Sequence, residues 1–207
     1  DLHLSLRRQR QMCIRDRYSN FPIIYYGVSY LGSFGEIGVN VKDGLAHLPK
    51  IELYYHNKPE LIITKGYQAE FTSQYEVASK VVDLFEKFNV KRIIVLAAHG
   101  SGGKRIFFAS TDQRIAEEMN KLGILRREPG EFFGFSALVL GMAALRDIEG
   151  FCLFAETTLD HSNPEKPDFD AVIRILEKLN EILDLDVDVS KLKGKKDEKP
   201  ERLDYFK

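Results

Sequence analysis

An unbroken apolar run at residues 93–98, followed by a loop with three glycines, constrains the fold of this 207-residue chain more than any other feature. A strand that is apolar on both faces is typical of the centre of a sheet covered on both sides. In open α/β sheets, ligands bind outside the carboxyl ends of such strands. We therefore predict a central strand at residues 91–98 and a candidate ligand loop after it, formed by His99, Gly100, Ser101, Gly102 and Gly103.

Strand and helix patterns alternate before this run, which favours the α/β class. Residues 60–64 have the pattern of a short buried strand, and residues 73–89 repeat apolar side chains at helical spacing behind a Ser73–Glu76 capping box. Because strand, helix and strand follow in close succession, we predict a βαβ unit in which residues 60–64 and 91–98 are parallel strands. Further upstream, the Asp43-Gly44 dipeptide predicts a hairpin turn, with residues 48–55 as the returning strand.

The pattern continues after the glycine loop. Residues 105–109 are predicted to form a strand, and a second capping box, Ser110 with Gln113, to begin a helix that ends at a left-handed Gly123. Residues 134–146 are apolar on every helical face, which indicates a helix buried against the sheet or in an oligomer interface.

Residues 150–155 form a second doubly apolar strand, which ends at Glu156. Asp168 is then predicted to cap an amphipathic helix. The core face expected for this helix comprises Phe169, Val172, Ile173, Leu176, Leu179 and Leu183. These patterns together predict an α/β three-layer sandwich with a mostly parallel central sheet.

Charge divides the chain into three parts. Residues 1–17 and 191–207 each carry a formal charge of +3, and because the whole chain carries −1, residues 18–190 carry −7. An acidic body argues against nucleic acid as the main partner. We therefore predict a single α/β domain at residues 18–190, followed by a charged flexible tail at residues 191–207.

The remaining composition excludes several classes of protein. Two cysteines, Cys13 and Cys152, imply no disulfide framework, and Cys152 within its apolar run is expected to be a buried apolar side chain. No apolar run is long enough to span a bilayer and no signal peptide is evident, so the prediction is a cytoplasmic protein without membrane contact. No set of His, Cys and acidic residues has metal-ligand spacing, and no cofactor is expected.

Catalytic templates fit the glycine loop poorly. A Walker A motif would need glycine at Ala98 and serine or threonine at Arg105, and a nucleophile elbow would need glycine at His99. A triad of Ser101 with His99 or His161 and with Asp160 is an open alternative. Glu156, at the end of its strand, is either a carboxylate that accepts loop amides or a catalytic acid or base.

Three sequence blocks resemble the proteasome assembly chaperone 2 family, in its archaeal-type members. The blocks are LIITKGYQAEFTSQYEVASKVVDLFEKFNVKRIIVLAAHGSG, GFSALVLGMAALRDIEGFCLFAET and IRILEKLNEILDLDVDVSKL. The resemblance implies a fold similar to nucleoside phosphorylases and the role of a non-catalytic, ATP-independent chaperone. It also implies proteasome α subunits as partners and a homo-oligomer as the working form.

The two ends of the chain differ from this family pattern. Some members carry a C-terminal hydrophobic-tyrosine-any-residue motif that enters pockets between α subunits, and this chain has Tyr205, Phe206 and Lys207 there. Residues 1–17 resemble translated sequencing-adapter readthrough, so we expect a non-native arm in place of the family's first strand and glycine turn. The alternative function is a phosphorylase- or hydrolase-type enzyme that uses the Gly100–Gly103 loop and Glu156.

Overall fold

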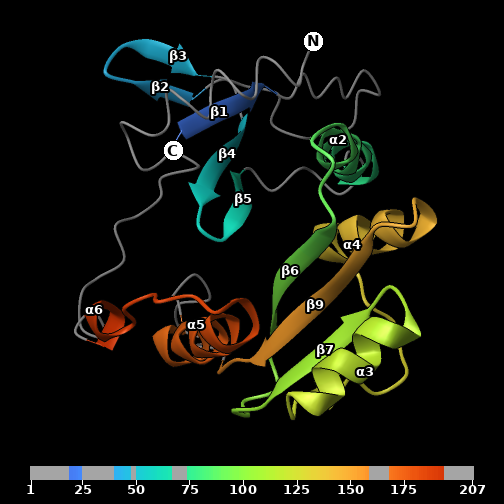
Figure 1. Ribbon diagram of the computed structural model, residues 1–207. Coiled ribbons are helices and arrows are strands. Elements are labelled where there is room, and N and C mark those ends of the chain that lie inside the picture. The colour runs from blue at the N-terminus through green and yellow to red at the C-terminus, as the bar shows by residue number, and fades with distance from the viewer. Residues whose placement is uncertain (1–18, 25–39, 48–49, 67–73, 159–167, 194–207) are drawn as a thin grey trace. The chain divides into compact units, whose positions relative to one another are not determined.

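The computed structural model describes residues 19–24, 40–47, 50–66, 74–158 and 168–193 (Figure 1). The chain divides into two compact units, residues 1–73 and residues 74–207, which are described in turn. The single domain expected for residues 18–190 stays a prediction.

The first unit contains two small antiparallel sheets. Strands β1 (Ser19–Ile24), β4 (Lys50–Asn57) and β5 (Glu60–Gly66) pair in the order β1-β4-β5. Strands β2 (Asn40–Lys42) and β3 (Leu45–His47) form a hairpin.

The hairpin turn was predicted correctly, but its returning strand was not. Asp43 and Gly44 have φ values of 52° and 78°, the left-handed pair that a two-residue hairpin turn requires. The chain returns immediately as β3, whereas β4 covers most of the predicted returning segment and pairs with β1 and β5.

The second unit contains a mixed four-stranded sheet in the order β6-β9-β7-β8. Its strands are β6 (Arg92–His99), β7 (Ile106–Ser110), β8 (Leu125–Arg126) and β9 (Glu149–Glu156). The pairs β6–β9 and β7–β8 are parallel, and β7–β9 is antiparallel. The α/β class is therefore confirmed, with a sheet of mixed direction.

One prediction about the order of strands is wrong. Strand β9, not β6, lies at the centre of this sheet, and β6 is at its edge among the described strands (Figure 1). Leu96 of β6 is nearly half exposed, whereas β9 is buried along almost its whole length. The predicted βαβ unit would join β5 of the first unit to β6 of the second, and this pairing stays a prediction.

Helices cover both faces of the mixed sheet, and alternate residues of β9 face them. Phe151, Leu153 and Ala155 pack with α3 (Gln113–Lys121) and α5 (Phe169–Leu183) in one apolar cluster. Cys152 and Phe154 pack with Leu140 of α4 (Phe135–Leu145) in another. Helix α2 (Gln74–Lys87) packs against α4, and the short α6 (Ser190–Lys193) follows α5.

Most of the predicted helix ends agree with the structure. Gly123 has a φ of 71° after α3, as predicted. The N-cap of α3 is Asp112 and not Ser110, because the Asp112 carboxylate accepts the amide of Ile115 at 2.9 Å. Ser73, the predicted cap of the helix at residues 73–89, lies outside the described residues. On α5, Ile173 and Leu179 are buried as expected, but Val172 is exposed.

Asp168 caps α5 as the sequence predicted, and its removal should weaken the fold. Its carboxylate accepts the amides of Ala171 and Thr158, each at 3.0 Å. Asp168→Ala is expected to lower the free energy of unfolding by about 1–2 kcal/mol, because the two amides lose their acceptor. Denaturant unfolding measures this change. Asp168→Asn keeps one of the two acceptor oxygens and should cost less than Asp168→Ala, and an equal cost for both variants would contradict the capping role.

Candidate functional site

The predicted site residues meet at the carboxyl ends of β6 and β9. The parallel register places His99 opposite Glu156, so the loop that follows β6 begins beside the end of β9. Arg105, two residues after this loop, leads into β7, which pairs with the other side of β9. The role of these residues as a ligand site stays a prediction, but their proximity defines the chemistry available there.

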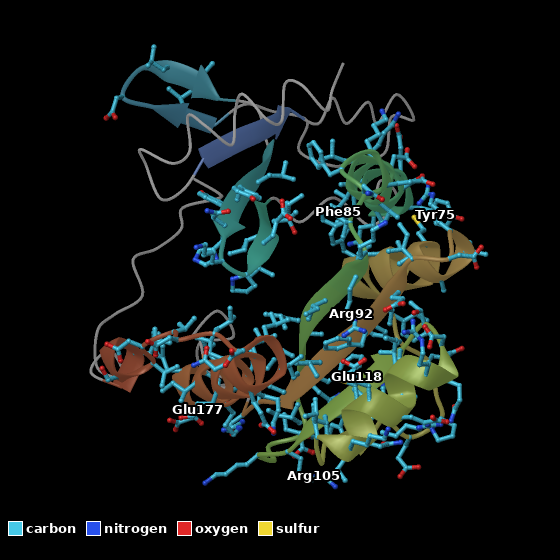
Figure 2. All side chains as sticks on the ribbon, viewed as in Figure 1. Tyr75, Phe85, Arg92, Arg105, Glu118 and Glu177 are labelled. Carbon is cyan, nitrogen blue, oxygen red and sulfur yellow. The ribbon has the colours of Figure 1, made fainter. Side chains whose placement is uncertain are left out.

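Glu156 is held by Arg105, a residue that the sequence analysis did not select. One Glu156 carboxylate oxygen accepts the Arg105 amide at 2.8 Å, and the other accepts the Arg105 guanidinium at 2.8 Å. The Glu156 side chain is 1% exposed and the Arg105 side chain is 65% exposed. The carboxylate of this ion pair is therefore buried, and the arginine side chain is at the surface, where Figure 2 labels Arg105.

Gly103 makes room for this carboxylate. A Cβ atom at position 103 would lie 1.9 Å from Glu156 Oε2 and 2.4 Å from Cδ. No side chain fits at that separation without moving the carboxylate. The glycine is therefore required by the close approach of Glu156 rather than by an external ligand.

Two loop amides also donate hydrogen bonds within the protein itself. The Ser101 amide donates to the His99 carbonyl at 2.8 Å, and the Gly102 amide donates to the Thr157 carbonyl at 3.0 Å. The Thr157 amide donates in turn to the His99 carbonyl at 2.8 Å. Since an anion-binding nest depends on free amides, these bonds reduce the capacity of the loop to bind a phosphate.

The electrostatics of Glu156 are those of a structural ion pair. The Arg105 side chain, followed by the Arg105 amide, lowers the pKa of Glu156 to about 2, and burial opposes this shift only in part. A general acid at neutral pH needs a raised pKa, and a carboxylate bonded to a guanidinium is a weak base. The geometry therefore favours the structural interpretation of Glu156 over the catalytic one.

This lowered pKa predicts a specific dependence of stability on pH. A carboxylate whose pKa falls from about 4.5 to about 2 on folding stabilises the protein above pH 4.5, and that contribution disappears as the pH falls toward 2. Glu156→Gln should therefore be less stable than the natural protein near neutral pH, and the difference should shrink below pH 4.5. Urea unfolding at a series of pH values measures this difference.

A matched control for this prediction is Glu177→Gln, which removes the same charge from an exposed position on α5. Its effect at neutral pH should be much smaller, because isolated surface charges contribute little. A Glu156→Gln difference that stays constant as the pH falls would show that Arg105 does not hold the carboxylate in its charged form.

A second arginine, Arg174 of α5, was also missed by the sequence analysis. Its Nη2 donates to the Glu156 carbonyl at 2.6 Å, and its Nε is buried without a hydrogen-bond partner among the described residues. No local motif marks Arg174. Arg105 could have been found, because arginine is the natural partner of a buried carboxylate and Arg105 lies two residues after the loop.

The remaining candidate residues lie outside the described part of the chain or are not at the site. Asp160 and His161, the other members of the open triad, lie outside it, as do Tyr205, Phe206 and Lys207. Cys152 is buried as predicted, and burial raises the pKa of its thiol to about 12.

Two further observations on the described part of the chain concern membranes and metals. No helix there is long and apolar enough to cross a membrane. The same residues contain no cluster of three or more His, Cys, Asp or Glu side chains suited to a metal ion.

The sheet and its covering helices define an α/β protein. In its glycine loop, the buried Glu156 carboxylate and hydrogen bonds within the protein fix the backbone. A family model, described as the PAC2 family, matches residues 29–204. The chain belongs to the PAC2 family.

Solved structures share this fold. The chain is similar to PbaA of Pyrococcus furiosus, an archaeal homologue of proteasome-assembly chaperone, with 23% identity and a TM-score of 0.63 over 76% of this chain and 68% of that one. The chain is also similar to PbaB of the same organism, an archaeal proteasome activator. The identity is 24% and the TM-score is 0.67, over 77% of this chain and 72% of that one. For a PAC2 family protein of Streptomyces avermitilis, the identity is 14% and the TM-score is 0.63, over 75% of this chain and 69% of that one. No curated protein matches the chain.

Proposed function

We propose that this protein is an ATP-independent, non-catalytic chaperone that binds proteasome α subunits in the cytoplasm as a homo-oligomer. The observation that carries the proposal is the PAC2 family match across residues 29–204. It is supported by the likeness of the fold to an archaeal homologue of proteasome-assembly chaperone and to an archaeal proteasome activator. As part of the proposal, the complete sheet forms a three-layer sandwich similar to the nucleoside phosphorylase fold.

The contact with α subunits is proposed to include Tyr205, Phe206 and Lys207. Aromatic side chains give large contact areas at low cost in conformational entropy, and a phenolic hydroxyl adds a hydrogen bond when it is buried. The chain has Phe206 at the position where the family motif has tyrosine. We therefore expect binding that is weaker than a tyrosine would give.

A binding experiment with archaeal proteasome α subunits tests the proposal. The full chain should retain α subunits in a pull-down, and a chain that ends at Glu201 should retain less. Phe206→Tyr should strengthen binding and Phe206→Ala should weaken it, so this pair separates the ring from its hydroxyl. Absence of binding by the full chain and by Phe206→Tyr would contradict the proposed function.

The alternative enzyme function has less support from the described residues. It needs Gly100–Gly103 to bind an anion and Glu156 to transfer a proton. The Gly102 amide is bonded to Thr157, and Glu156 is paired with Arg105. A third hypothesis, an oligomeric protein with another client, shares the surface features of the first and differs only in the partner.

A further inference from the structure

The turn of the β2–β3 hairpin places an aspartate directly before a glycine at an exposed position. Asp43 and Gly44 form this turn, and both residues are exposed. A Cβ atom added to Gly44 would meet nothing within 4 Å, so the space beside it is open to water. Asp43-Gly44 is the one Asp-Gly dipeptide of the chain, which contains no Asn-Gly.

This dipeptide carries the two groups needed for a spontaneous change of its own peptide linkage. The amide nitrogen of Gly44 can close a five-membered ring on the Asp43 carboxyl carbon, Cγ. Such an attack within one chain is favoured, because the two reacting groups are already held near each other. Glycine hinders the attack least of all residues, since it has no Cβ atom beside the nitrogen.

The hairpin offers little resistance to the backbone rotation that ring closure requires. Asp43 has a left-handed φ of 52°, which is maintained only while the hairpin stays paired. Strands β2 and β3 have three residues each, and Val41 and Leu45 are 69% and 64% exposed. A two-stranded hairpin whose apolar side chains stay exposed is marginally stable in water. We therefore expect it to open locally while the rest of the chain stays folded.

We propose that Asp43 is a site of spontaneous isomerisation to isoaspartate. The Gly44 nitrogen forms a bond to Asp43 Cγ, and one carboxyl oxygen leaves as water with the amide hydrogen and the carboxyl proton. Water then opens the cyclic imide. Opening at Cγ restores aspartate, whereas opening at the original main-chain carbonyl leaves Gly44 joined through Cγ. One water molecule is released and one is taken up, so no oxidant or reductant takes part.

The isomer alters the turn that produced it. The main chain then passes through Cβ and Cγ of residue 43 and is one atom longer, while the former main-chain carbonyl carbon becomes a side-chain carboxylate. A two-residue hairpin turn requires left-handed φ values at both positions, and the lengthened backbone does not provide them. The pairing of Lys42 with Leu45 should therefore be lost. This change does not depend on the proposed binding of α subunits, so the two proposals stand or fall separately.

Two other aspartates of the chain are matched comparisons. Asp147 and Asp184 are exposed and have left-handed φ values of 54° and 50°. They are followed by Ile148 and Leu185, whose side chains stand beside the attacking nitrogen. The three aspartates therefore share a backbone conformation and differ in the residue that follows.

Incubation of the full chain at constant temperature and neutral pH tests the proposal. Peptide mapping with electron-transfer fragmentation distinguishes isoaspartate from aspartate of equal mass. Isoaspartate should accumulate at residue 43 and remain near its starting level at Asp147 and Asp184. Gly44→Ala should slow the accumulation several-fold, because it adds a methyl group beside the nitrogen. Asp43→Glu should abolish it, because a longer side chain would have to close a six-membered ring.

The same incubation in a denaturing concentration of urea shows what the hairpin contributes. In the folded chain, isoaspartate at residue 43 should form at a rate comparable to that in the denatured chain. Absence of isoaspartate at residue 43 in the folded chain would overturn the proposal, whatever the denatured chain shows. Equal accumulation at Asp43, Asp147 and Asp184 would also overturn it, because the glycine and the exposed hairpin would then have no influence on the site.

Discussion

Phe151→Ala is expected to lower the free energy of unfolding by about 3–5 kcal/mol, the largest effect of any substitution considered for this protein. Phe151 lies on the central strand β9, is fully buried and faces α3 and α5. Removing its ring leaves a cavity between the sheet and both helices, and the neighbouring strands on each side of β9 restrict any collapse into it.

Denaturant unfolding of Phe151→Ala beside Phe133→Ala checks this expectation. Phe133 has the same side chain, but it is 75% exposed, so its removal should change the stability by less than about 0.5 kcal/mol. Similar losses for the two variants would contradict the position of β9 at the centre of the fold.

Gly103→Ala is the second large expected effect, with a loss of about 1–3 kcal/mol from overpacking. The new Cβ atom would overlap the Glu156 carboxylate, whose Oε2 lies 1.9 Å from the Cβ position. A carboxylate at the end of a flexible side chain can often move away. This one is buried and is held by the amide and the guanidinium of Arg105, so moving it breaks an ion pair.

A double-mutant cycle isolates this cause. The three atoms nearest the Cβ position all belong to the Glu156 carboxyl group, so Glu156→Ala removes the overlap completely. Gly103→Ala should then cost little in the Glu156→Ala background, and the two substitutions should be strongly non-additive. An equal cost of Gly103→Ala in both backgrounds would show that the glycine is needed for another reason.

For the second unit, the sequence predicted which residues form helices and strands better than it predicted which strands pair. Residues 134–146, residues 150–155 and the helix capped by Asp168 all form the expected elements. Each of these predictions depends on residues close together in the sequence, because the spacing of apolar residues and the cap residues determine a helix or strand over a short segment. The end of α3 at Gly123 was predicted on the same basis.

Strand order could not be predicted in the same way. The runs at residues 93–98 and 150–155 are both apolar on each face, so the sequence gives no reason to place one rather than the other at the centre. The order depends on which strands pair across long stretches of chain, and β7 reaches β9 as an antiparallel neighbour.

For the candidate site, the sequence indicated which residues lie near one another but not the partner of Glu156. The sequence placed Glu156 at the same sheet edge as the glycine loop, and the parallel register of β6 and β9 brings them together. The sequence pattern could not show that Arg105 would pair with Glu156, since this contact spans 51 positions. A loop that had the composition of an anion site is instead filled by a carboxylate from the protein itself.

Native mass spectrometry of this protein mixed with α subunits tests most directly the proposal that it assists proteasome α subunits without ATP. Purified archaeal α subunits should form complexes containing the natural chain in ATP-free buffer, and their conversion to rings should be faster than without it. Phe206→Tyr should increase both effects. Detection of α subunits and this protein only as separate species, with an unchanged rate of ring formation, would contradict the proposal.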